Sequence, residues 1–163
     1  MAEAKTLDDL FLDTLKDIYY AEKQIVKALP RMAKAAQSPQ LKSGFEEHLA
    51  QSEIHIERLE KVFEQIGKPA RGKTCEAILG ILEESKSIME EFKDTDAIDA
   101  GLVSAAQAVE HYEIARYGTL RTWAEQMGMS NVARLFEQTL GEEIATDKKL
   151  SQVAEGEANR KAA

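Results

Sequence analysis

The segment SPQLKSGFEEHLAQSEIHIERLEKVFEQIG, residues 38–67, decides the fold class. Ser38 followed by Pro39 is typical of a helix cap and first turn, and Gly67 is typical of a helix end. Between these ends, apolar residues recur at steps of three and four from Leu41 to Phe63, which is the period of one helix face. The segment is therefore predicted to form one long amphipathic helix.

The same spacing of apolar residues covers the rest of the chain, which has only three prolines and no segment that alternates like a β-strand. Thr6, Asp96 and Ser130 are the expected caps of three further long helices. Pro30 is expected to kink the first helix, and the tail from about Gly156 is expected to fray. We predict helices at about residues 6–37, 39–66, 75–92, 96–127 and 131–155.

The connection between the two predicted hairpins begins with residues 67–74, GKPARGKT, which have the composition of a loop. Its glycines and basic residues do not indicate a phosphate-binding loop, because that motif must follow a strand. Two helical hairpins joined by a long connection with its own helix describe a four-helix bundle with one crossover, the ferritin-like topology. We expect a single domain over residues 1–163.

The charge and composition exclude several classes of partner. The chain has 21 basic and 29 acidic residues, a formal net charge of −8, so nucleic acid and membrane surfaces are not expected partners. Apolar residues make up 44% of the chain, enough for the core of one domain. No apolar run approaches the roughly 20 residues that span a bilayer. With the single cysteine Cys75 and no signal-like start, the protein is expected to be cytoplasmic.

An internal repeat relates the two hairpins. Sliding the chain against itself by 91 positions superposes the first hairpin on the second without a gap. The identical pairs are Glu22 and Glu113, Leu29 and Leu120, Ala33 and Ala124, Phe45 and Phe136, Leu49 and Leu140, Leu59 and Leu150, and Val62 and Val153.

Five polar residues lie on or beside the apolar faces, near the middle of their helices: Glu22, His55, Glu113, Glu143 and Asp147. Their side chains are expected to point at one another. Burying unpaired carboxylates together costs several kilocalories per mole, so a cation must compensate for them. Lysines and arginines lie mostly off these faces, with one main exception, Arg116. A bound pair of metal ions is the simplest explanation.

Each of these residues also has a purely structural interpretation. A lone glutamate can reach solvent through a gap between helices, and a lone His55 is more often a hydrogen-bonded core histidine than a ligand. His48 is expected to be structural or to support a ligand, and His111 lies off the apolar face. The tyrosines are expected to serve packing. The combination favours metal ligation for the five residues.

Four stretches together resemble the bacterial YciE and YciF stress-protein family, a group within the ferritin-like superfamily considered to be di-iron proteins of uncharacterised activity. These are residues 17–22 (DIYYAE), 48–55 (HLAQSEIH), 110–113 (EHYE) with 117–120 (YGTL), and 142–147 (EEIATD). The resemblance implies that Glu22 and Glu113 are terminal carboxylates, that Glu143 bridges two metals, and that His55 is the imidazole ligand.

The chain departs from the ferritin-like pattern at two positions. Ser52 stands where a bridging glutamate is expected, and Thr146 stands where a second histidine is expected. Asp147 could supply a missing ligand, and Glu110, one turn from Glu113, could help.

Two functions remain open. The first is a stress-related protein with a di-metal centre. Iron or manganese is expected there, because carboxylate and imidazole donors suit these metals. The resemblance implies that the protein is a di-iron oxidoreductase that oxidises ferrous iron or handles peroxide or oxygen. The second is a non-enzymatic helical dimer whose degenerate metal site leaves it a structural or partner-binding role. A homodimer is expected in either case, through an apolar patch at Trp123, Met127 and Met129.

Overall fold

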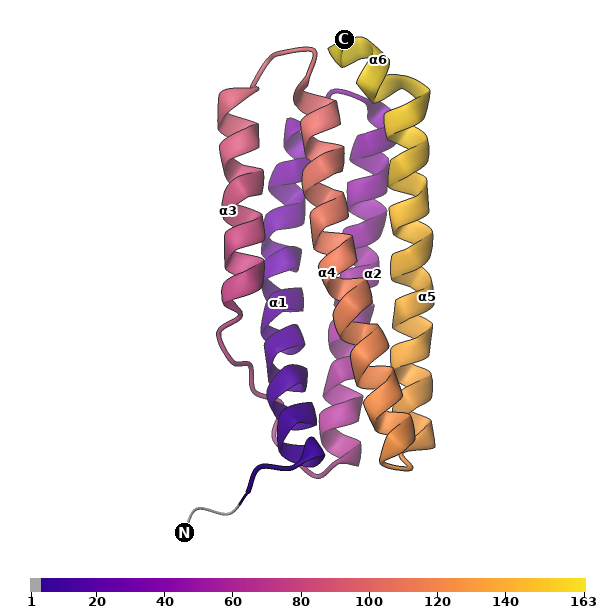
Figure 1. Cartoon of the computed structure of the whole chain (residues 1–163). Coiled ribbons are helices and arrows are strands. Elements are labelled where there is room, and N and C mark those ends of the chain that lie inside the picture. The colour runs from indigo at the N-terminus through magenta and orange to yellow at the C-terminus, as the bar shows by residue number, and fades with distance from the viewer. Residues whose placement is uncertain (1–3) are drawn as a thin grey trace.

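The computed structural model describes residues 4–163, and this part of the chain is helical with no β-strand. The elements are α1 (Leu7–Ala35), α2 (Pro39–Gln65), α3 (Glu76–Glu91), α4 (Ile98–Gln126), α5 (Ser130–Val153), a π-helical turn (Ala154–Ala158) and α6 (Asn159–Ala162). Figure 1 shows α1, α2, α4 and α5 as four long, roughly parallel rods, with α3 beside α1 and α4. The prediction of an all-helical bundle with a crossover helix is confirmed.

The first two helices begin where their capping residues predict. Thr6 forms a reciprocal capping box with Asp9: the Thr6 backbone N–H donates to Asp9 Oδ2 at 2.8 Å, and the Asp9 N–H donates to Thr6 Oγ1 at 3.4 Å. Ser38 Oγ accepts from the Leu41 N–H at 3.4 Å, and Pro39 occupies the first turn of α2. Local sequence therefore sets both starting points.

Two other expected caps are wrong. The N-cap of α4 is Ala97, not Asp96, and no side chain in residues 4–163 caps this helix start; the Thr95 hydroxyl accepts from the Ala97 N–H at 3.3 Å in the turn before it. The N-cap of α5 is Met129, and Ser130 is already helical. The α4–α5 turn is very short because Gly128 adopts a φ of 74° there. Because of this tight turn, α5 begins at Ser130 itself, one residue earlier than predicted.

The chain end also differs from the expectation of fraying. Residues after Gly156 remain helical through Ala162, and Ala158 is buried. Lys161 Nζ donates to Gln37 Oε1 at 2.6 Å, which ties this end to the α1–α2 connection. Tertiary contacts therefore hold a segment whose sequence alone is weakly helical.

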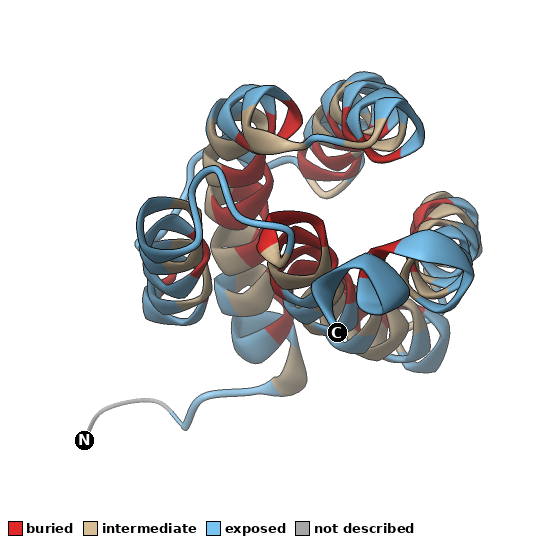
Figure 2. Cartoon of the chain, turned by 90° about the horizontal axis from the view of Figure 1, so that it is seen from above, coloured by how far each residue is buried: buried red, intermediate tan, exposed pale blue. Residues whose placement is uncertain are grey.

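The core lies between the four long helices, and Figure 2 shows their buried residues facing inward. A buried acid fixes one end of it: Asp99 at the start of α4 accepts from the backbone N–H of Gln37 at 2.8 Å and of Ser38 at 2.9 Å. These two bonds dock the α1–α2 connection onto α4. They also set the height at which α2 enters the bundle.

Trp123, Met127 and Met129, the residues of the expected apolar patch, are half-buried and pack against the core, so each is exposed only in part. The exposed large apolar side chains are distributed over several elements: Leu10, Ile54, Leu79, Phe92 and Ile144. Over residues 4–163, no helix combines the length and the hydropathy needed to cross a bilayer.

Candidate metal centre

Six titratable side chains meet in the middle of the bundle, each 3% exposed or less. They come from all four long helices: Glu22 of α1, His48 and His55 of α2, Glu110 and Glu113 of α4, and Glu143 of α5. The pairs on α2 and α4 are spaced by seven and three residues, so each pair lies on one helix face.

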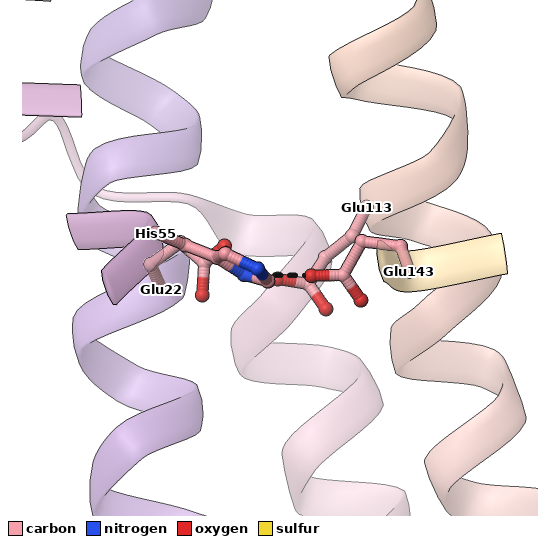
Figure 3. Close-up of side chains that lie close together, drawn as sticks. All are labelled: Glu22, His55, Glu113 and Glu143. Atoms are coloured by element: carbon pink, nitrogen blue, oxygen red, sulfur yellow. Dashed lines mark ion pairs between the residues drawn. The ribbon is translucent and has the colours of Figure 1, made fainter. Parts of the chain in front are cut away.

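The six residues form two overlapping groups of four, and within each group the possible ligand atoms lie within 4.8 Å of one another. The first group is Glu22, His55, Glu113 and Glu143, and Figure 3 shows these side chains converging from opposite sides of the core. The second group is His48, Glu110, Glu113 and Glu143. Glu113 and Glu143 belong to both groups, which is the arrangement that two adjacent ions with shared carboxylates would need.

Four of the five predicted site residues therefore lie together, and the fifth does not. Asp147 is 23% exposed, and its Oδ1 lies 3.1 Å from His111 Nε2 and accepts from Gln107 Nε2 at 3.3 Å. These contacts hold its carboxylate at the outer edge of the α4–α5 interface. Asp147 is in neither of the two groups.

The sequence analysis missed His48 as a candidate ligand and named Glu110 only as a helper. The signal for His48 was its position seven residues before His55, two helical turns away on the same face. Without the fold, nothing distinguishes such a histidine from a structural one. The structure places its Nδ1 3.0 Å from Glu110 Oε1, and its Nε2 3.8 Å from Glu143 Oε2.

Ser52 and Thr146, the two positions where the chain departs from the ferritin-like pattern, belong to neither of the two groups. Ser52 is fully buried on α2. Thr146 Oγ1 donates to Gln51 Oε1 at 3.2 Å, across the gap between α2 and α5. The second imidazole of the cluster comes from α2, as His48, rather than from α5.

Many of the buried oxygens have unused hydrogen-bonding capacity. Within residues 4–163, both carboxylate oxygens of Glu110, Glu113 and Glu143, and Oε2 of Glu22, lack a well-aligned hydrogen bond. Two of these oxygens, Glu110 Oε1 and Glu143 Oε1, lie 3.0 and 2.8 Å from a histidine nitrogen. Buried polar atoms are nearly always paired in native proteins, so a concentration of unpaired oxygens at one place indicates a missing ligand. Free carboxylate lone pairs directed at a common point are what a metal ion requires.

In the described part of the chain, no lysine or arginine side chain neutralises these glutamates, whose ion pairs are with His48 and His55. Arg116, the one base expected near the apolar faces, instead lies over the Tyr112 ring, 5.0 Å from its centroid. The cluster therefore needs either protons or cations to be stable.

The pKa values show how protons would fill that need. Burial, followed by the hydrogen bond with Glu143 and the charges of Glu143 and Glu22, raises the pKa of Glu110 to about 12. Burial and the charges of Glu143 and Glu22 raise the pKa of Glu113 well above its usual range. Burial would also raise the pKa of Glu143, but Glu110 and His55 outweigh this and lower it to about 2. Protons on Glu110 and Glu113 thus stand in the place of metal charge.

The two histidines differ in charge. Burial lowers the pKa of His48 and favours its neutral form. Burial acts in the same direction on His55, but the adjacent carboxylates of Glu143 and Glu22 outweigh it and raise the pKa of His55 to about 10. His55 Nδ1 lies 2.8 Å from Glu143 Oε1 and 3.3 Å from Glu22 Oε1.

Two side chains hold ligands in place from outside the groups. Glu142 Oε2 lies 2.8 Å from His55 Nε2, and Arg58 donates hydrogen bonds to both carboxylate oxygens of Glu142 at 2.6 and 2.8 Å. The buried Tyr117 hydroxyl donates to Glu22 Oε1 at 2.6 Å. Burial raises the pKa of Tyr117, so it remains a neutral donor. Tyr117 therefore not only packs in the core, as expected of the tyrosines, but also donates a hydrogen bond to Glu22.

A helical bundle with a buried cluster of glutamates and histidines defines the class of this protein. A family model described as "Domain of unknown function (DUF892)" matches residues 6–163, and the chain belongs to this family. Protein YciF of Escherichia coli strain K12 is 42% identical over 159 residues, which cover 97% of this chain and 96% of the relative. The resemblance to the YciE and YciF family is thereby confirmed.

Solved structures agree with this assignment. The crystal structure of the E. coli stress protein YciF matches with a TM-score of 0.91 and 41% identity, covering 96% of this chain and 99% of that one. YcfI from Rhodopseudomonas palustris matches with a TM-score of 0.90 and 46% identity, covering 92% of this chain and 96% of that one.

Proposed function

We propose that this protein binds two iron or manganese ions in its bundle core and uses them for redox chemistry. The observation that carries this proposal is the sharing of Glu113 and Glu143 between two four-residue groups of buried ligand atoms. Two ions bound a short distance apart require such shared carboxylates, whereas buried glutamates kept for stability alone would be paired with bases.

The ligand sets follow from the two groups. Glu22 and His55 would hold one ion, Glu110 and His48 would hold the other, and Glu113 and Glu143 would bridge them. Each ion would thus have carboxylate donors and one imidazole, a set that suits iron or manganese better than soft metals. In this proposal Glu113 would bridge the two ions, whereas the ferritin-like pattern implies a terminal role for it.

A pair of such ions supplies one-electron oxidation and reduction at each ion, and the activity we propose is oxidation of ferrous iron or reduction of peroxide or oxygen. The chain itself contributes charge and orientation. Glu142 holds the Nε2–H of His55, which leaves Nδ1 for a metal. Tyr117 fixes one oxygen of Glu22. Burial of all six ligands excludes bulk water. The description of E. coli YciF as a stress protein supports a role of this kind.

Metal content tests the proposal. The protein is purified without chelators, or loaded anaerobically with ferrous iron, and its iron and manganese are measured by elemental analysis. About two ions per chain are expected from the two groups. A chain that takes up no metal after anaerobic loading overturns the proposal and leaves the non-enzymatic dimer with a degenerate site.

We further propose that the protein is a cytoplasmic homodimer. The buried free thiol of Cys75 suits a reducing compartment. Light scattering at micromolar concentration should give twice the chain mass of 18.1 kDa, and a single chain mass contradicts the dimer.

A further inference from the structure

A pocket of about 410 Å³ lies between α2 and α5, beside the metal-binding cluster. We name it the α2/α5 pocket, and its lining includes Gly44, Glu47, His48, Gln51, Thr146 and Lys149. Its volume falls within the roughly 300–1,000 Å³ typical of small-molecule sites. Of these six residues, His48 alone also belongs to a metal-binding group. The pocket therefore leads from the surface to the edge of the candidate metal centre.

Small side chains keep this space open. Gly44 lies inside α2, and a Cβ atom built on it would meet nothing within 4 Å. Glycine in a helix interior costs about 1 kcal/mol relative to alanine, so helix stability does not favour it here. On the facing helix, Thr146 is short and spans the gap only through its hydrogen bond to Gln51 at 3.2 Å. Neither helix stability nor the packing of the core therefore explains why the space beside Gly44 is left open.

A buried polar side chain forms the inner wall. His48 is 3% exposed, and its Nε2 has no hydrogen-bond partner in the described part of the chain. This atom lies 3.9 Å from Glu113 Oε2 and 3.8 Å from Glu143 Oε2. A molecule that fills the pocket would therefore contact a histidine that borders both shared carboxylates.

The lining carries no net charge from its acidic and basic residues. Lys149 Nζ donates to Glu47 Oε1 at 2.9 Å, and this exposed ion pair cancels the charge of its two members. Apart from His48 and Gly44, the rest of the lining consists of amide, hydroxyl and apolar side chains, among them Gln51, Thr146, Leu41 and Leu150. Such a lining attracts neither cations nor anions and offers both hydrogen bonds and apolar contact.

We propose that the α2/α5 pocket binds a small uncharged organic molecule that carries a hydroxyl or hydroperoxyl group on an apolar body. Gln51 and Thr146 would bond the oxygen group beside His48, and Leu41 and Leu150 would contact the apolar body. The use of such a molecule as a substrate rests on the proposed metal function, but its binding does not require metal.

The test uses the full-length, metal-free protein labelled with ¹⁵N and the probe 2-phenyl-2-propanol, an unreactive alcohol of this shape. Saturable NMR shifts are expected at the amides of Gly44, Gln51 and Thr146 and at the His48 ring. Gly44→Leu should weaken binding about tenfold or more by filling the pocket. Gly44→Ala is the matched control, because leucine and alanine have similar helix propensities, and it should bind within about twofold of the natural chain, since its Cβ meets nothing within 4 Å.

The pocket proposal is overturned if no saturable shift appears at these residues, or if Gly44→Leu binds the probe as tightly as Gly44→Ala. Metal content separates this outcome from failure of the metal centre, because Gly44 belongs to neither metal-binding group. Normal metal uptake without probe binding contradicts the pocket alone. Probe binding in a chain that takes up no metal supports the pocket and contradicts the proposed redox function.

Discussion

His55 Nε2 lies 2.8 Å from Glu142 Oε2, so the imidazole is held from the side opposite to its buried carboxylate partners. Arg58, followed in effect by His55, lowers the pKa of Glu142, against the opposing effect of burial. An ionised carboxylate can only accept hydrogen bonds, so Nε2 carries the proton. Nδ1 is thereby turned toward Glu22 and Glu143.

Glu142→Gln is expected to weaken metal binding about 10- to 100-fold, the usual effect of losing a carboxylate that orients a histidine ligand. The amide can still accept a hydrogen bond from His55, but the negative charge that pairs with Arg58 is lost. Competition with a coloured chelator measures the affinity. The control is Glu137→Gln on the same helix, whose carboxylate is 67% exposed. Equal affinities for the two variants would show that Glu142 does not orient His55.

Glu113→Gln should reduce the metal content below one ion per chain, because Glu113 belongs to both groups. In the metal-free protein this variant should be as stable as the natural chain, within about 1 kcal/mol, or more stable, because burial already favours a neutral Glu113 side chain. Elemental analysis and urea unfolding test the two statements. A loss of several kilocalories per mole with unchanged metal content would make Glu113 a structural residue.

The two groups should be separable by mutation. His48→Gln removes an imidazole from the second group only, and His55→Gln removes one from the first group only. Each variant is expected to retain about one ion per chain, whereas the double variant should retain none. If the His48→Gln variant keeps both ions, His48 is not a ligand, and the second group does not hold metal.

The α1 capping box gives a pH-dependent prediction that is independent of metal. The backbone hydrogen bond with Thr6, and then the side-chain bond, lower the pKa of Asp9 below its usual 3.8. A lowered pKa means that Asp9 stabilises the fold above pH 3.8 and that this contribution is lost as the pH falls through the lowered value. Carboxyl NMR titration should show the Asp9 pKa rising in Thr6→Ala. An unchanged pKa would contradict the capping box.

Asp99→Ala should destabilise the bundle by about 2 kcal/mol, because the backbone N–H groups of Gln37 and Ser38 lose their acceptors. Urea unfolding of the metal-free protein measures this change. The control is Asp96→Ala, whose carboxylate is 77% exposed and is expected to change stability by about 0.5 kcal/mol or less. Similar losses in both variants would mean that the two bonds do not dock the α1–α2 connection.

Several features of the fold follow from local patterns. Apolar spacing and the caps at Thr6 and Ser38 predict the helices correctly, because these signals act within one or two turns. The caps expected at Asp96 and Ser130 are wrong because α4 begins after Ala97 without a side-chain cap, and a tight glycine turn makes Met129 the N-cap of α5. The helical end of the chain was not foreseen, since contacts with residues far away in the sequence hold it.

The sequence by itself determined the register of the two hairpins, since the repeat aligns Glu22 with Glu113 and brings His55 and Glu143 to the same level of the bundle. Only the tertiary structure decided which further side chains join them. His48 enters and Asp147 stays outside because the rotation of each helix about its axis, set by packing against its neighbours, directs one side chain inward and leaves the other beside His111. A periodic pattern defines a helix face to within a broad arc, whereas ligand atoms that lie within 4.8 Å of one another depend on rotations much smaller than that arc.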